Sequence, residues 1–237
     1  FYDTDRDHIL DECVRYDQLG PNVIHKVPAT AAGIAAMADL LRRGRSVLAT
    51  EMMSVAQIHA VCRMYQEVLP QAEGKPCLVV THITGIYDEY LAGHAAEVAP
   101  DLAKEDLVEA GFIAARIVRK VLDGYQLPVT LLGGGVRVLR HFTDMVGGNI
   151  HVTINPADIE QLVAADQPVV NRFQEPIDQA QRERLEAALP DFRRAIADDG
   201  LQPEEFQEFG PVLHFLASFK KGWLAVRRML EEHQARA

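Results

Sequence analysis

The sequence predicts an α/β fold with a parallel sheet, because short apolar runs alternate with stretches of helical periodicity. The expected strands are residues 23–27, 46–53, 77–83, 129–132 and 151–154. The expected helices between them are residues 31–43, 54–68, 103–122 and 138–146. Residues 84–101 are a polar stretch to which we assign no regular structure. With 237 residues, 48% of them hydrophobic, the chain can form one sizeable core, and one α/β barrel is a normal use of this length.

Local signals support the ends of individual elements. The helix over residues 31–43 has its apolar side chains on one side, at Ile34, Met37, Leu40 and Leu41. Ser54 can cap the helix that follows the second strand, and Gly124 marks the end of the helix that begins near residue 103. Pro156 fits the first turn of a helix after the fifth strand. Residues 1–20 contain a further helix, with apolar positions at Ile9, Leu10, Cys13, Val14 and Leu19.

The remainder of the chain is charged, helical and interrupted by prolines. We expect helices at residues 177–189, 191–198, 203–209 and 211–232. The last of these has an apolar stripe of Val212, Phe215, Leu216, Phe219, Trp223, Val226 and Leu230. We expect this stripe to pack against the barrel or a neighbouring subunit. The chain therefore divides into residues 1–166, the α/β part, and residues 167–237, a helical extension.

Composition excludes several classes of function. A formal net charge of -10 repels phosphate backbones, which argues against a nucleic-acid partner. No apolar run approaches the roughly 20 residues that a membrane span needs. The three cysteines, Cys13, Cys62 and Cys77, form no CxxC pair, so we interpret them as reduced thiols of a cytoplasmic protein. We find no HExxH motif or Cys/His spacing, and we expect no metal and no organic cofactor.

The run "NVIHKVPAT", residues 22–30, ends a strand-like apolar segment in a lysine. A buried lysine is costly unless it is paired, neutral or catalytic. By strand alternation Ile24 shares the face of Lys26, whereas His25 and Val27 face the helix layer. We therefore interpret His25 as a packed or hydrogen-bonded residue. Lys26 is either a functional group on the inner face or an exposed lysine at the end of a strand.

Five segments resemble the transaldolase family, which includes the fructose-6-phosphate aldolases. In order, they are "VIHKVPATAAGIAAMADL", "SVLATEMMSVAQ", "LVVTHITGI", "TLLGGGVRVLRHF" and "HVTINPADIEQL". Each motif alone is only moderately specific, but five in this order and spacing form a strong signal. The resemblance covers residues 5–165 and is weaker in the C-terminal helices. It implies a (β/α)8 TIM barrel of the transaldolase type, with its first three strands absent from this sequence, followed by C-terminal helices.

The resemblance also implies functional residues. Lys26 matches the Schiff-base lysine of the family, and enclosure in an apolar barrel would favour its neutral amine. Thr50 matches a threonine near that lysine, and Thr81 matches the hydroxyl residue that helps to hold the catalytic water. Arg137 matches a phosphate-binding arginine, and we expect it to form an anion site with open backbone N–H groups of the triple glycine, at Gly134 and Gly135. The alternative readings are ordinary strand threonines and a helix-surface arginine.

The sequence departs from the family pattern at three positions. Leu48 stands where transaldolases have an asparagine, Ile86 where they have a second phosphate-binding arginine, and Gly135 where they have a serine. These changes weaken the phosphate site or point to a substrate with another anion or none. Glu51 and His82 have no family counterpart, and by alternation we interpret them as structural polar groups that face outward.

The number of strands also differs. The lysine strand is the fourth in the family barrel, and the first three strands carry its acid/base aspartate and a glutamate. Five strands cannot close that barrel, because strand number, tilt and diameter are linked. We therefore expect either an N-terminal part outside this sequence or an open sheet whose edge a partner covers.

The function implied by the resemblance is class I aldol chemistry on a ketose phosphate, in which a three-carbon dihydroxyacetone unit is transferred or released. This is transaldolase chemistry of the pentose phosphate pathway in carbohydrate metabolism. The expected partner is a sugar phosphate or related ketose, together with a homo-oligomer formed through the C-terminal helices. Three alternatives stay open: a phosphate-binding isomerase or epimerase that uses "GGGVR" alone, a non-catalytic relative that acts as a binding or assembly subunit, and a globular fold with an incidental lysine.

Overall fold

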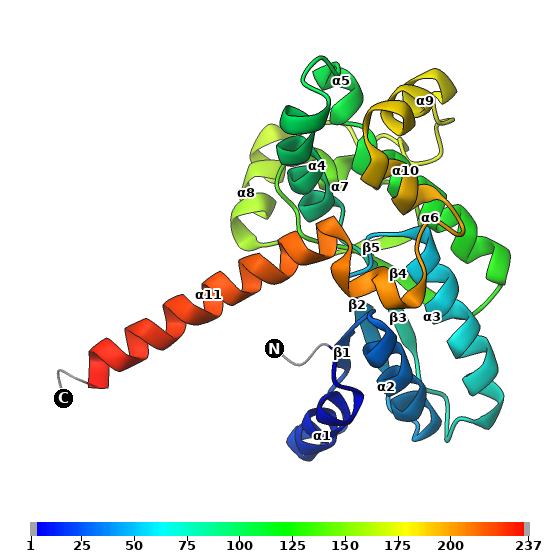
Figure 1. The fold of residues 1–237 in the computed structure, drawn as a ribbon, viewed down its shortest axis with the longest axis vertical. Helices are drawn as coiled ribbons and strands as arrows, with labels where there is room; N and C mark the ends of the chain where they lie inside the picture. Colours follow the sequence, from blue (N-terminus) through cyan, green and yellow to red (C-terminus); the bar gives the residue numbers. More distant parts are fainter. Residues whose placement is uncertain (1–3, 235–237) are drawn as a thin grey trace.

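The computed structural model describes residues 4–234, which form one five-stranded parallel sheet with helices around it (Figure 1). The strand order is β1-β2-β3-β4-β5, so every strand lies next to its neighbour in sequence. The strands are β1 (His25–Pro28), β2 (Val47–Thr50), β3 (Leu78–His82), β4 (Val129–Gly133) and β5 (Ile150–Val152). All five predicted strands are therefore present. An α/β fold of this kind is built from βαβ crossovers.

Helices connect the strands and form the C-terminal part. Those in the first part are α1 (Arg6–Tyr16), η1 (Asp17–Leu19), α2 (Ala31–Arg42), α3 (Val55–Val68), η2 (Leu69–Gln71), α4 (Thr84–Val98), α5 (Lys104–Leu107), α6 (Ala110–Tyr125), α7 (Arg140–Thr143) and α8 (Pro156–Ala165). Those in the C-terminal part are α9 (Gln179–Ala188), α10 (Pro190–Ile196), η3 (Pro203–Glu208) and α11 (Gly210–Gln234). Ser54 caps α3 as predicted, since its side chain accepts from the backbone N–H of Gln57.

The two faces of the sheet have different surroundings. One face is packed against α2, α3 and α6, and the strand residues Val27, Ala49, Val80 and Leu131 are buried in that core. The parallel register places Lys26, Leu48, Val79 and Thr130 in a row across the opposite face. Lys26 and Thr130 are exposed in this row, and Leu48 and Val79 are half-buried. The predicted alternation along β1 is confirmed, because His25 and Val27 are buried and Ile24 and Lys26 are exposed.

Residues 4–234 do not close a barrel. In the described part of the chain β1 and β5 are the two ends of the sheet, and each pairs with one strand only. The structure therefore shows an α/β fold with an open parallel sheet. An eight-stranded barrel stays a prediction.

A second core joins the helices of the α/β part to the C-terminal segment. It contains Tyr87 and Leu91 of α4 together with Phe192, Phe206 and Phe209, and all five side chains are almost fully buried. Burial of aromatic side chains of this size contributes a large share of the hydrophobic stabilisation. The division of the chain at residue 166 stays a prediction.

Three helical segments differ from the sequence analysis. The polar stretch after β3 is the helix α4, whose buried Tyr87, Leu91 and Ala95 follow one another at intervals of four residues. The single helix expected over 103–122 is broken into α5 and α6, and the helix expected over 138–146 is reduced to the short α7.

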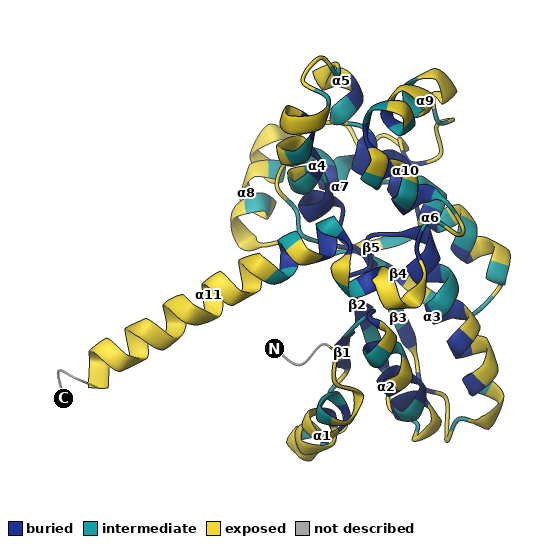
Figure 2. Cartoon of the chain, viewed as in Figure 1, coloured by how far each residue is buried: buried dark blue, intermediate teal, exposed yellow. Residues whose placement is uncertain are grey.

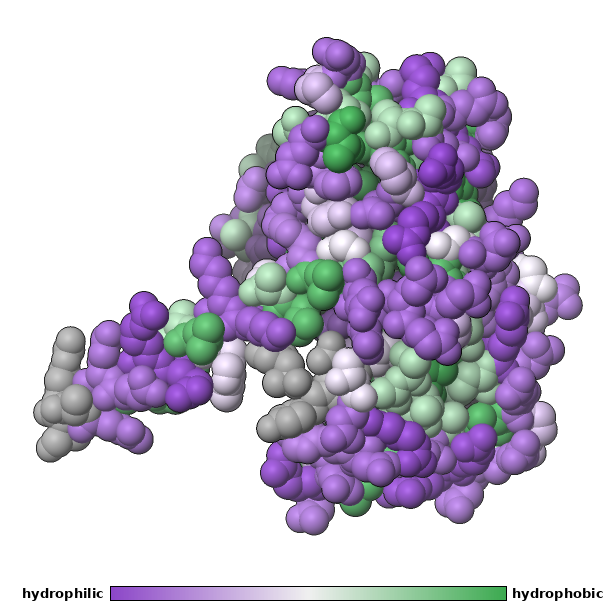
Figure 3. Space-filling view, viewed as in Figure 1, coloured by the Kyte–Doolittle hydropathy of each residue, from purple (hydrophilic) through white to green (hydrophobic). Residues whose placement is uncertain are grey.

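The last helix leaves the body of the molecule after its first turns. Pro211, Val212 and Phe215 are buried, but the predicted stripe is exposed from Phe219 onward (Figure 2). Apolar side chains are visible on the free part of α11 in the space-filling view (Figure 3). The expectation that the stripe packs against the barrel therefore holds only for the start of this helix. No helix among residues 4–234 is long and apolar enough to cross a membrane.

Candidate active site

Lys26 lies on the open face of the sheet, in a cleft of about 840 Å³ between α1, β1 and the start of α11. Thr50 also lines this cleft, and Phe215, Phe219 and Trp223 approach from α11. Lys26 makes no hydrogen bond or ion pair with residues 4–234. Its side chain is exposed, so the described residues do not provide the apolar enclosure that the sequence analysis expected.

The neighbouring histidine has the structural role predicted for it. His25 is buried on the helix side of β1, and its Nε2 lies 2.8 Å from Oδ1 of Asp17. Arg45 donates to the other carboxylate oxygen at 2.7 Å. Burial raises the pKa of Asp17, but the hydrogen bonds from His25 and Arg45 outweigh it and hold that pKa below its ordinary value. This cluster fixes the entry of the chain into the lysine strand.

Two buried hydroxyls lie on the same face of the sheet as the lysine. Thr50 and Thr81 directly follow Ala49 and Val80, which are register partners on β2 and β3. The Oγ1 atoms of both threonines are buried, and neither has a hydrogen-bond partner within residues 4–234. Buried hydroxyls normally find a partner, because leaving one unsatisfied costs about 1–3 kcal/mol. Two such groups at the carboxyl edge of the sheet are typical of a functional site.

The triple glycine forms a tight turn after β4. Gly135 has a φ of +64°, and a Cβ atom there would lie 2.5 Å from Ile83 and 2.7 Å from Ile86. A serine at this position would therefore require these isoleucines to move, so Gly135 fits the present packing. The N–H of Gly134 donates to the carbonyl of His82 at 3.3 Å. The expectation of an open N–H group at Gly134 is therefore wrong.

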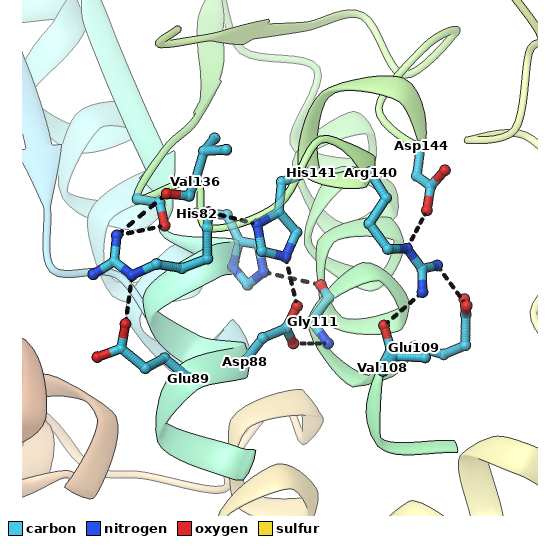
Figure 4. Close-up of polar contacts among 12 residues, drawn as sticks. His82, Asp88, Glu89, Val108, Glu109, Gly111, Val136, Arg140, His141 and Asp144 are labelled. Atoms are coloured by element: carbon cyan, nitrogen blue, oxygen red, sulfur yellow. Dashed lines mark hydrogen bonds and ion pairs between the residues drawn. The ribbon is translucent and has the colours of Figure 1, made fainter. Parts of the chain in front are cut away.

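The side chain of Arg137 is held by groups of the protein itself. Its Nε donates to Glu89 of α4, and its Nη1 donates to the carbonyls of Gly135 at 3.2 Å and Val136 at 3.3 Å. The Glu89 contact is drawn in Figure 4. Glu89 also lies 2.9 Å from Nε2 of His214 on α11. The hydrogen bonds from Arg137 and His214 lower the pKa of Glu89, so it carries its charge at neutral pH.

The sequence analysis missed a buried polar network behind this loop. Nδ1 of His141 accepts from the backbone N–H of Arg137 at 3.1 Å, and its Nε2 donates to Asp88 at 3.0 Å (Figure 4). Asp88 also accepts from the N–H of Gly111 at 2.7 Å. Burial raises the pKa of Asp88, and the hydrogen bond from His141 opposes that change. The network therefore ties the arginine loop to α4 and α6.

His82 continues the same network on the helix side of β3. Its Nε2 lies 3.3 Å from the carbonyl of Gly111, and full burial lowers its pKa to about 4 against that hydrogen bond. The ring is therefore neutral at pH 7 and donates to Gly111. The prediction that His82 faces outward is confirmed, whereas Glu51, for which the same was predicted, lines the cleft of Lys26.

Arg140 fixes the short helix α7 through contacts separate from the pair of His141 and Asp88. It donates to Asp144 one turn later at 2.7 Å and to the carbonyl of Val108 at 3.1 Å, and it forms an ion pair with Glu109. These contacts and the His141 pair hold α7 against the N-terminus of α6. The arginine loop is thus anchored on both of its sides.

The first turns of α11 connect the lysine cleft to the arginine loop. His214 contacts Glu89, whereas the adjacent Phe215 lines the cleft of Lys26. The carboxyl ends of β1 and β4 lie at the same edge of a parallel sheet. Lys26 and Thr50 line one cleft and Thr81 lies on the same face of the sheet, whereas Arg137 lies beyond the carboxyl end of β4 and does not line that cleft.

The described residues thus combine an unpaired lysine, two unsatisfied hydroxyls and an arginine loop in an α/β fold with a parallel sheet. A family model for transaldolase/fructose-6-phosphate aldolase matches residues 2–208, which is most of the chain. The chain belongs to this family, and membership supports a transaldolase or aldolase type of activity. A search of curated proteins found no match.

Proposed function

We propose that this chain carries out transaldolase-like class I aldol chemistry on a ketose phosphate through a Schiff base at Lys26. A three-carbon dihydroxyacetone unit would then be transferred to an aldose or released. The observation that carries the proposal is an unpaired lysine that shares a cleft with the unsatisfied hydroxyl of Thr50 and a face of the sheet with that of Thr81.

The chemistry needs an amine, a proton carrier and a carbonyl substrate. The neutral amine of Lys26 attacks the ketone carbon, and loss of water from the carbinolamine gives the iminium ion. A general base then takes the C4 hydroxyl proton, and the C3–C4 bond breaks. The fragment that begins at C4 leaves as an aldehyde, and the bonding electrons pass into the iminium to form a three-carbon enamine. The enamine attacks an aldehyde in the transferase reaction, or takes up a proton and is hydrolysed in the aldolase reaction.

Thr50 and Thr81 have the right chemistry to hold the water that is lost and regained. Each hydroxyl can donate one hydrogen bond and accept others. Arg137 would bind the anionic end of the substrate, and Gly134 and Gly135 would shape the loop that presents it. The proposal also requires a cover over the open face, because the attack needs a neutral amine and an apolar enclosure favours that form. Further strands or a partner chain would provide that cover.

The test is borohydride trapping. The protein is incubated with fructose 6-phosphate, reduced, and analysed by intact-mass and peptide mass spectrometry. We expect a reduced adduct on the peptide that contains Lys26, its loss in Lys26→Met, and its persistence in Lys75→Met, where an exposed lysine is replaced.

An adduct on a different lysine would refute the assignment. If neither fructose 6-phosphate nor unphosphorylated ketoses gave an adduct, the aldolase proposal would be wrong, and a non-catalytic relative would be the better interpretation.

A further inference from the structure

The arginine of the proposed anion site is already engaged by a carboxylate. A guanidinium has five N–H donors in a planar fork. In Arg137 the Nε donor contacts Glu89 and Nη1 contacts two backbone carbonyls, so within residues 4–234 only Nη2 lacks a partner. A phosphate that binds Arg137 in two-point geometry must therefore displace Glu89 or approach through Nη2 alone.

Glu89 has a polar partner for each of its carboxylate oxygens. One of its oxygens contacts Arg137, and the other lies 2.9 Å from Nε2 of His214. These contacts lower its pKa, so the negative charge is present at neutral pH. The formal charges of Glu89 and Arg137 cancel.

The neighbouring positions Ile86 and Gly134 do not offset the negative charge of Glu89. Ile86 is buried and would contact any Cβ atom added at Gly135, so no second cation is presented from this position. The N–H of Gly134 is used by the carbonyl of His82. A phosphate dianion would thus meet one arginine and, next to it, a carboxylate of like charge.

We infer that Glu89 determines substrate specificity by competing with phosphate for Arg137, so that the site accepts unphosphorylated ketoses alongside phosphorylated ones. This inference rests on the proposed function. An unphosphorylated ketose has no anion that must displace Glu89, and its hydroxyl groups can accept from Nη2 or donate to the carboxylate. In this arrangement the Arg137–Glu89 pair is a polar ligand for a sugar rather than a phosphate clamp.

The experiment compares two ketones in the trapping reaction at Lys26. The rates of adduct formation with fructose 6-phosphate and with dihydroxyacetone are measured for the full chain and for Glu89→Gln, Arg137→Gln and the double variant. We expect Glu89→Gln to raise the ratio of the phosphorylated to the unphosphorylated rate about tenfold, since it removes a like charge beside the guanidinium. The gain should disappear in the double variant. Glu97→Gln, at an exposed position on the same helix, should leave the ratio unchanged.

Sulfate binding by calorimetry gives a second reading that does not need the imine. We expect Glu89→Gln to bind sulfate about tenfold more tightly than the unmodified chain. Glu89→Ala serves as the second variant if Glu89→Gln does not give a native circular dichroism spectrum, and the same increase is expected.

The outcomes separate the two proposals. One outcome is that adducts form while Glu89→Gln leaves unchanged, or lowers, both the ratio of the phosphorylated to the unphosphorylated rate and the affinity for sulfate. In that case this inference is wrong and the Schiff-base proposal stands. If no variant forms an adduct with either ketone, the Schiff-base proposal fails, whatever sulfate does.

Discussion

The side-chain amide of Gln57 donates to the backbone carbonyl of Ala29 at 3.0 Å and so ties α3 to the end of the lysine strand. Its second N–H donates to the carbonyl of Glu51 at 2.9 Å. The amide oxygen accepts from the N–H of Met53 at 2.8 Å and from the hydroxyl of Ser54 at 3.1 Å. Gln57 is fully buried, and both ends of its amide are satisfied. It thereby fixes the ends of β1 and β2, which carry Lys26 and Thr50.

We expect Gln57→Leu to lower the free energy of unfolding by about 3 kcal/mol, because it leaves buried backbone groups without partners. Urea unfolding followed by circular dichroism measures this change. The matched control is Gln71→Leu, because Gln71 is exposed and its side chain donates, among residues 4–234, one hydrogen bond, to the carbonyl of Glu67. Its effect should stay within about 0.5 kcal/mol. Equal effects of the two variants would contradict the role assigned to Gln57.

His82 should make stability depend on pH. Its pKa is about 4 in the folded protein and 6.5 in the reference state, because burial disfavours the charged ring. Between these values the unfolded chain binds more protons than the folded one, so stability falls as pH decreases from about 6.5 towards 4. From pH 7 to pH 5 this group alone should remove about 2 kcal/mol from the free energy of unfolding.

The control for this prediction is His82→Gln, whose amide can still donate to Gly111 but does not titrate. Urea unfolding at pH 7 and pH 5 should give a smaller loss in this variant than in the unmodified chain, by the same amount of about 2 kcal/mol. Other titrating groups contribute equally to both proteins and cancel in the difference. Identical losses would show that another group causes the acid sensitivity.

Sequence reasoning could predict the parts of the fold that depend on local pattern. The alternation of buried His25 and Val27 with exposed Lys26 follows from the strand period alone. The cap at Ser54 follows from the residue preference of helix N-termini. The placement of Lys26 and Leu48 on one face follows from the parallel register of β1 and β2.

What it could not predict depends on contacts between distant segments. The pair of Asp88 and His141 joins residues 53 positions apart, and neither has a local signal. The sequence does not indicate helix α4, because Gly85 and Gly93 interrupt a stretch of intermingled polar and apolar residues. In addition, Tyr87 is buried partly by residues of the C-terminal segment. The pairing of Arg137 with Glu89 could not be inferred either, because the two residues are far apart in the sequence. Its consequence is that Glu89 already occupies the arginine that was expected to bind an anion.

Leu48 should limit the rate of imine formation. It is the register partner of Lys26 on β2, at the position where the resemblance to the family implies an asparagine. A polar amide at this position can donate to the oxygen of the carbinolamine, which an alkyl side chain cannot do. We expect Leu48→Asn to raise the rate of borohydride-trapped adduct about tenfold.

The matched control is Leu48→Ala, which opens the same space without a donor. It should not increase the trapping rate. If Leu48→Asn were no faster than Leu48→Ala, the apolar residue would not be the limiting feature, and the absence of a cover over the sheet would become the better explanation.

The exposed part of α11 should bind a second copy of the chain. Phe219, Trp223, Val226 and Leu230 are spaced by four, three and four residues, which places them on one face of the helix. Trp223 and Leu230 are each 58% exposed. An apolar face of this length on a helix that leaves the body is typical of a helix–helix interface.

We therefore expect a homo-oligomer in sedimentation velocity, and its dissociation in the double variant Trp223→Glu/Leu230→Glu. Glu231→Gln, an exposed change on the same helix, should leave the oligomer intact. A monomeric unmodified chain would refute this interface. Because Phe219 and Trp223 also line the cleft of Lys26, dissociation should be accompanied by a lower rate of trapping at the lysine.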